Sequence, residues 1–203
     1  DGLPLCPHGR LILAPRVGKS KIAIDIIKKG KPKSILWVTP SAELAEIDIP
    51  KEFKIWKAEK YLKCLQTTTW MSLHKVQGKF DLIILDEEQF ITEANAVNLI
   101  NGSLSGQIVS MTGTETKHAD KQMLYSALNL KVLYRLSVNA AVDMGLLSNY
   151  SVSVIDIDMD RTSKVIKGGS KDKPFMTTEF ANYQYVDRMA QQAIFQKRKD
   201  ATF

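Results

Sequence analysis

The chain has little of what builds metal cages or disulfide frameworks. Among its 203 residues are only two cysteines, Cys6 and Cys64, and they form no C-x-x-C pair. Its three histidines, His8, His74 and His118, lack the spacing of metal ligands. These shortages argue against a zinc-binding or disulfide-stabilised protein and favour a reducing compartment.

Long hydrophobic runs are also missing. No apolar stretch approaches the ~18 residues that a membrane span needs, and no signal peptide is visible. We therefore expect no membrane partner and a cytoplasmic location. The chain begins with Asp1 rather than Met, and we expect it to be a piece of a longer protein.

The composition is 44% hydrophobic and 25% charged, which is typical of a globular domain. The net charge of +6 and the pI of about 9.2 suit contact with polyanions without establishing it. Five lysines recur at every third position, which on a helix winds around the axis instead of making one face. We interpret them as a solvated basic surface in preference to a nucleic-acid groove. They are Lys51, Lys54, Lys57, Lys60 and Lys63.

Short β-rich runs alternate with helical stretches along the chain. The expected strands are Arg10–Ala14, Ser34–Thr39, Leu62–Thr67, Leu82–Leu85, Gln107–Met111, Val132–Leu136 and Val152–Ile157. The expected helices are Lys19–Lys29, Trp70–Val76, Ala94–Asn101, Lys117–Leu128 and Asn139–Leu146. Several strands are apolar at consecutive positions, as in parallel sheets covered on both faces. The pattern predicts an α/β fold with a mostly parallel central sheet flanked by helices.

The C-terminal part reads differently. Lys167–Pro174, "KGGSKDKP", has loop composition and is predicted to be a linker. Thr178–Lys199 has apolar residues at 3–4 spacing and is predicted to be an amphipathic connector helix. We therefore divide the chain into a domain over residues 1–160, and a linker and helix over 161–203.

The stretch "LILAPRVGKSKIAIDII" predicts a strand, a turn and a helix that opens at Lys19. This is the setting of a phosphate-binding P-loop, although Leu13 stands where the first glycine of the full motif belongs. Lys19 would reach the terminal phosphates, and the Ser20 hydroxyl would ligate Mg²⁺. A helix start with an exposed lysine is the competing interpretation. The predicted nucleotide-binding residues are Arg16, Val17, Gly18, Lys19, Ser20 and Lys21.

The stretch "LIILDEEQF" brings three acids to the end of an apolar strand, which raises the question of what cation meets them. Ligands of open parallel sheets bind at the carboxyl ends of the strands, so this stretch and the P-loop should share an edge. Asp86 would hold Mg²⁺, and Glu87 would take a proton from an attacking water. The alternative is a solvated acidic turn that caps a helix.

With both motifs present, the sequence resembles the first RecA-like domain of superfamily 2 helicases and translocases. The nearest types are the DEAD/DEAH-box and Swi/Snf-like members, including phage-type relatives. "APRVGKS", "ILWVTPSAEL", "LIILDEEQF" and "SMTGTE" resemble motifs I, Ia, II and III in the expected order. "CLQTTTWMSLHK" resembles the segment around motif Ib. "VLYRLSVNAAVDMGLLSNYSV" resembles the family's passage after motif III. The likeness extends from about Leu11 to Val154.

The resemblance implies a RecA-like P-loop NTPase that uses ATP and Mg²⁺. Gln89 would join Lys19, Asp86 and Glu87 in catalysis. Thr112 and Thr114 follow the strand expected beside that of motif II, and their hydroxyls could bond Asp86 or Gln89. Residues for coupling nucleotide state to domain closure would be Ser110, Thr112 and Thr114. Nucleic-acid contacts, to DNA more than RNA, would come from Pro40, Ser41, Thr68 and Thr69.

The sequence also departs from the family. Arg16 stands where many members have glycine, and Glu115 where Swi/Snf relatives usually have proline. Motifs IV to VI are not found, so we expect a second RecA-like domain elsewhere in the parent protein as a partner. We expect little hydrolysis from residues 1–203 alone, because the family's arginine finger comes from that second domain. If the gene is phage-encoded, the compartment is the host cytoplasm.

The leading hypothesis is thus the ATP-binding half of a nucleic-acid-dependent ATPase. A P-loop kinase of a small molecule is the second, but an arginine-rich lid is not apparent. A catalytically inactive nucleotide- or nucleic-acid-binding module is the third. The intact Lys19, Ser20, Asp86 and Glu87 argue against it.

Overall fold

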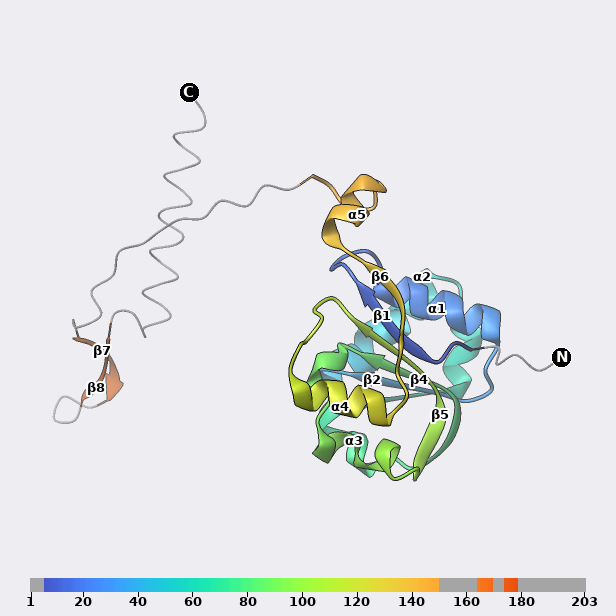
Figure 1. The fold of residues 1–203 in the computed structure, drawn as a ribbon, viewed down its shortest axis with the longest axis horizontal. Coiled ribbons are helices and arrows are strands. Elements are labelled where there is room, and N and C mark those ends of the chain that lie inside the picture. Colours follow the sequence, from blue (N-terminus) through green and yellow to red (C-terminus); the bar gives the residue numbers. More distant parts are fainter. Residues whose placement is uncertain (1–5, 150–163, 170–173, 179–203) are drawn as a thin grey trace. The chain divides into compact units, whose positions relative to one another are not determined.

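The computed structural model describes residues 6–149, 164–169 and 174–178. The chain divides into two units, Asp1–Asn149 and Tyr150–Phe203. The first unit contains a six-stranded sheet with helices on both faces (Figure 1). Within the described residues, no helix is both long and apolar enough to cross a membrane.

The strands of the sheet are β1 (Gly9–Leu13), β2 (Ile35–Thr39), β3 (Leu65–Thr69), β4 (Gly78–Asp86), β5 (Leu104–Thr112) and β6 (Val132–Leu136). The α-helices are α1 (Lys19–Gly30), α2 (Ile49–Ile55), α3 (Glu93–Ile100), α4 (Ala119–Ala127) and α5 (Val138–Asp143). A π-helical turn, η1 (Leu44–Asp48), precedes α2. Three 3₁₀ turns complete the unit: η2 (Glu59–Cys64), η3 (Trp70–Lys75) and η4 (Glu88–Phe90).

The strand order is β3-β2-β4-β5-β1-β6, and every neighbouring pair is parallel. The first strand in sequence is therefore placed between the fifth and the sixth. This order brings the end of β1 next to the end of β5, which in turn adjoins β4. The segments that follow these three strands share one edge of the sheet, where parallel α/β folds bind ligands.

Two apolar cores cover the two faces of the sheet. One packs α1 and α2 against inward residues such as Trp37 and Ile84. The other packs α3 and α4 against residues such as Ile83 and Leu85. Figure 1 shows these helix pairs on opposite sides of the strands. The double covering explains why all five residues of β2 are buried, and it confirms the predicted α/β class with a parallel sheet.

Some local predictions were wrong. The strand expected at Leu62–Thr67 begins at Leu65, because residues Glu59–Cys64 form a 3₁₀ turn that buries Tyr61 against the core. The helix expected at Trp70–Val76 is present as a 3₁₀ helix over Trp70–Lys75, whereas η1 and α2 were not predicted. The expected strand Val152–Ile157 lies outside the described residues.

In the second unit, β7 (Lys164–Gly169) and β8 (Pro174–Thr178) form an antiparallel pair. The stretch predicted to be a linker, Lys167–Pro174, therefore contributes residues to both strands. Thr178, predicted to start the connector helix, ends β8. The rest of that predicted helix lies outside the described residues.

Gly106 is expected to tolerate no side chain. A Cβ built at this position would lie 2.4 Å from the backbone oxygen of Phe80 on β4, where the β4–β5 register shifts. Gly106→Ala should lower the free energy of unfolding by roughly 1–3 kcal/mol, since overpacking against backbone cannot relax cheaply. Urea unfolding measures this, with the exposed neighbour Ser105→Ala as the control. Equal midpoints for both variants would contradict the packing of β5 on β4.

Candidate active site

The loop after β1 exposes backbone N–H groups at the start of a helix. Gly18 precedes α1 in a left-handed conformation, with φ 86° and ψ 47°, and has no side chain to cap the helix. Ala14 donates its N–H to Leu136 O at 2.9 Å, which ties the start of the loop to β6. The first N–H groups of a 12-residue helix and its dipole together attract an anion. The loop therefore has the chemistry of a phosphate cradle.

Arg16, which stands where the family often has glycine, also adopts a left-handed conformation, with φ 67°. A residue with a Cβ pays about 1–2 kcal/mol for this conformation, and glycine does not. A glycine at this position would therefore adopt the observed backbone conformation with less strain than arginine. The Arg16 side chain itself is exposed.

A connected line of polar side chains runs from this loop across the sheet edge. The Lys19 ammonium forms an ion pair with Glu87 Oε1. Gln89 Nε2 donates to Glu87 Oε2 at 2.9 Å, and Thr112 Oγ1 donates to Gln89 Oε1 at 2.7 Å. The Thr114 N–H in turn donates to Thr112 Oγ1 at 2.9 Å. The loop before α1, the segment after β4 and the end of β5 are thus joined by direct contacts.

Glu87 occupies a turn that aims its carboxylate at the loop. It adopts a left-handed conformation, with φ 53° and ψ 61°, directly before η4. Burial alone would raise the pKa of Glu87. Hydrogen bonds from Lys19 and Gln89 outweigh the effect of burial. Together with the Lys19 charge and a hydrogen bond from the Gly113 backbone, they hold the pKa of Glu87 below its usual value. Glu87 is therefore ionised while it is paired with Lys19.

Asp86 has the opposite electrostatics. Burial raises its pKa to about 6, and the negative charge of Glu87 adds to this, while Lys19 and a hydrogen bond from the Glu87 N–H partly oppose it. Asp86 and Ser20 line one cavity of about 290 Å³ between α1, α2 and β4. No group of three or more His, Cys, Asp or Glu among the described residues could hold a metal ion. Asp86 and Ser20 offer an oxygen pair that phosphate oxygens and water would complete for Mg²⁺.

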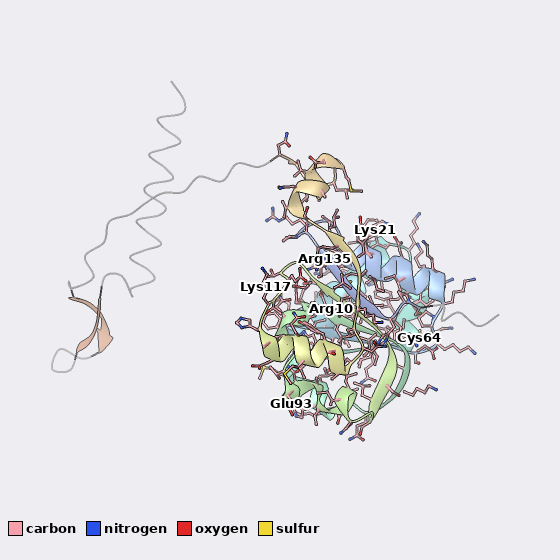
Figure 2. The ribbon with its side chains drawn as sticks, in the orientation of Figure 1. Arg10, Lys21, Cys64, Glu93, Lys117 and Arg135 are labelled. Carbon is pink, nitrogen blue, oxygen red and sulfur yellow. The ribbon has the colours of Figure 1, made fainter. Side chains whose placement is uncertain are left out.

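The third acid, Glu88, has a structural partner that the sequence reading missed. Arg10 Nε and Nη2 donate to Glu88 Oε1 at 2.9 and 2.6 Å, and both side chains are at most 4% exposed. Tyr125 packs its ring 3.8 Å from the guanidinium carbon of Arg10 and donates its hydroxyl to Glu88 O. The cations that meet Glu87 and Glu88 are thus Lys19 and Arg10 of the chain itself. Figure 2 labels Arg10 within the layered part of the unit.

Ser110, predicted as a coupling residue, lies in this buried cluster. It is 0% exposed and donates its hydroxyl to Glu88 Oε2. Arg10 and Ser110 are register partners across β1 and β5, which explains why they reach one carboxylate. The lone arginine in the otherwise apolar β1 run "GRLIL" was the available signal for this pair.

The predicted nucleic-acid contacts follow the carboxyl ends of two strands. Thr68 and Thr69 end β3 and pair in register with Val38 and Thr39 of β2. Pro40 and Ser41 come directly after Thr39. The Ser41 hydroxyl accepts from Leu44 N–H at 3.3 Å, which opens the helical turn that follows. These residues lie at the same edge of the sheet as the loop and the acids.

Two other predicted nucleotide contacts point elsewhere. Lys21 forms an ion pair with Asp25 at 2.5 Å and lies 5.2 Å from the Trp56 ring, on an exposed side of α1. Val17 packs against the core beneath the loop. The Val17 N–H already donates to Ala14 O at 3.5 Å, so of these two residues only Lys21 could offer a backbone N–H to a phosphate.

No known protein-family profile matches the chain, and no curated protein matches it. Among solved structures, the chain is similar to the Hef helicase domain of Pyrococcus furiosus, with a TM-score of 0.51 and 14% identity. The fold is RecA-like. The likeness covers 65% of this chain and 35% of the helicase domain, so the chain spans about a third of that structure. At this identity it supports a helicase-like fold and no finer assignment.

The Arg10–Glu88 pair gives a stability prediction. Glu88→Gln leaves a buried guanidinium without its counter-charge and should cost about 3–5 kcal/mol. The triple variant Arg10→Met, Glu88→Met and Ser110→Ala removes both charges and the hydroxyl that depends on them, and should remain within roughly 1 kcal/mol of the parent. Urea unfolding compares the three proteins. A single variant as stable as the parent would show that the pair is not buried in solution.

Asp86 gives a pH prediction. Its pKa rises from 3.8 to about 6 on folding, so the folded chain binds this proton more tightly than the unfolded chain. Stability is therefore lost as pH rises from about 3.8 to about 6, and it remains lower above this range. Asp86→Asn should raise the free energy of unfolding more at pH 7.5 than at pH 4. Asp120→Asn, on an exposed position of α4, is the control, and a pH-independent effect of Asp86→Asn would contradict the prediction.

Proposed function

We propose that this chain is the ATP-binding half of a nucleic-acid-dependent ATPase of the helicase or translocase type. The observation that carries the proposal is the line Lys19–Glu87–Gln89–Thr112. It joins a phosphate cradle to a carboxylate and to a neighbouring strand, beside the Ser20–Asp86 cavity. The RecA-like fold supports the same proposal.

ATP and Mg²⁺ are the ligands that these residues fit. Loop N–H groups and Lys19 would bind the terminal phosphates, and Ser20 and Asp86 would supply oxygen ligands to the ion. Asp86 remains mostly ionised at neutral pH because its pKa is about 6, as a metal ligand must. Bound Mg²⁺ would neutralise negative charge that develops on the phosphate oxygens.

Lys19 and Glu87 would then act in sequence. While they are paired, Glu87 is a weak base because Lys19 lowers its pKa. When Lys19 turns its ammonium to a phosphate, Glu87 loses that stabilisation and its pKa rises. Its carboxylate, still held by Gln89, becomes free to accept a proton from the attacking water. Phosphate binding thereby activates the base.

Gln89 and Thr112 would transmit a change at Glu87 to β5 and the segment after it, through their hydrogen bonds. A nucleic-acid strand would lie on Pro40, Ser41, Thr68 and Thr69, and DNA is the favoured ligand. A second RecA-like domain would supply an arginine to the phosphoryl group, so residues 1–203 alone should turn over ATP slowly. An enzyme of this kind closes its two domains on ATP and moves along the strand.

The test of phosphate binding is Lys19→Ala against Lys21→Ala. Both remove one lysine from α1, but only Lys19 contacts Glu87. We expect Lys19→Ala to weaken Mg-ATP binding in calorimetry at least ~10-fold, on the scale of one charge-assisted hydrogen bond, and Lys21→Ala to leave it nearly unchanged. Equal affinities for the two variants would overturn the P-loop assignment.

The test of catalysis is Glu87→Gln in the parent protein. It should keep ATP binding and reduce DNA-stimulated hydrolysis by about 10²–10⁴, the scale for removing a positioned base. Asp86→Asn should instead raise the Mg²⁺ concentration needed for binding. Normal turnover by Glu87→Gln would show that the base is another group. Transfer of phosphate to a small acceptor, without DNA stimulation, would favour a kinase.

A further inference from the structure

The edge of the sheet opposite the candidate active site carries two adjoining hollows. The first, of about 540 Å³, lies by the amino ends of β2, β4 and β5. The second, of about 360 Å³, lies between the α1–β2 connection and η2. Both are lined by the same segment, residues 31–33, which therefore forms the ridge between them.

Five exposed lysines surround these hollows, and we call this surface the lysine edge. They come from three parts of the chain: the α1–β2 connection, η2 and the start of β4. The lysine edge consists of Lys31, Lys33, Lys60, Lys63 and Lys79. None of them takes part in an ion pair within the described residues.

The one acid that lines either hollow is already engaged. Asp81 Oδ2 accepts the Lys33 backbone N–H at 2.7 Å, and the Asp81 N–H donates to Ser34. Asp81 keeps its negative charge in these contacts, so the five lysines exceed the acids that line the two hollows by four positive charges. The helix dipole favours positive charge at the C-terminus of a helix, which accounts for lysines near the end of α1, such as Lys31. It does not account for lysines from η2 and β4 at the same place.

We propose that the lysine edge binds the phosphate backbone of a nucleic acid without reading its sequence. Lysine ammonium groups on flexible stems suit phosphates as point charges and carry no base specificity. A membrane surface fits less well, because no exposed large hydrophobic side chain lines either hollow. The identity of the polyanion rests on the proposed function, whereas the existence of the surface does not.

The position of this surface gives it a distinct role. The loop, the acids and the predicted strand contacts all follow carboxyl ends of strands, whereas the lysine edge lies at their amino ends. Nucleic acid held here would not compete with a nucleotide at Lys19. It would retain a further segment of the same molecule near the domain while the strand at the opposite edge is released.

The experiment compares two triple variants of the chain that remove the same charge. Lys31→Gln, Lys33→Gln and Lys63→Gln alter the lysine edge. Lys54→Gln, Lys57→Gln and Lys117→Gln alter exposed lysines that line neither hollow. In Figure 2, Lys117 lies on a different side of the unit from Cys64, which lines the second hollow. Thermal unfolding of both variants checks that the fold is retained.

Fluorescence anisotropy with short duplex and single-stranded DNA of mixed sequence, over a range of salt, gives the readout. We expect the lysine-edge variant to bind at least ~10-fold more weakly at low salt. Its log–log salt slope should fall by about 0.7–0.9 for each phosphate that the variant no longer neutralises, and the control triple should change little. Mg-ATP affinity should be the same in all three proteins.

Three outcomes would overturn the proposal. The first is equal weakening by both triples, which would reflect net charge only. The second is no DNA binding by the unmodified chain, residues 1–203, at low salt. The third is loss of binding to phosphatidylserine vesicles with DNA binding intact, which would identify a membrane surface instead. An unchanged Mg-ATP affinity in Lys19→Ala, combined with loss of DNA binding by the lysine-edge variant, would support this surface and reject the proposed ATPase.

Discussion

The buried ion pair between Arg10 and Glu88 is the constraint around which the edge that carries the candidate active site is organised. Neither charge is exposed enough for water to solvate it, so each requires the other and the hydroxyl of Ser110. The pair joins β1 and β5 to the segment that follows β4, and Tyr125 extends it to α4. These elements are distant in sequence, and a shift of any one would leave a buried charge without its partner.

Three consecutive acids acquire three different properties from their surroundings. Asp86 is buried among partners that only partly offset desolvation, so its pKa is raised. Glu87 meets Lys19 and Gln89, so its pKa is lowered. Glu88 points into the interior and is fixed by Arg10. The residue between the other two, Glu87, has a left-handed backbone conformation. The proposed metal ligand Asp86 and the proposed base Glu87 therefore lie beside Glu88, which has a structural role.

The sequence predicted those features that depend on short segments. Buried strands such as Leu82–Leu85 were evident as apolar runs, and Lys19 and Asp86 were placed at strand ends by their motifs. Three-dimensional features were harder to predict. Nothing in a run of three acids says which one faces inward, and the 3₁₀ turn that displaces β3 depends on the burial of Tyr61. The lysines at 60 and 63 looked like part of a periodic run, yet they gather with Lys31, Lys33 and Lys79 from other segments.

The position of β1 in the sheet also affects how the protein is made. β1 precedes the other described strands in the sequence and leaves the ribosome before them, but both of its neighbours, β5 and β6, lie in the later part of the unit. At about 5–20 residues per second, the apolar run Gly9–Leu13 waits roughly 5–20 s for β5 to be synthesised. During that interval β2, β3 and β4 can pair, whereas the loop that leads to Lys19 has no strand beside it. The loop that we propose to bind phosphate therefore gains its neighbouring strands only late in the synthesis of the unit, although it precedes most of the unit's described elements in the sequence.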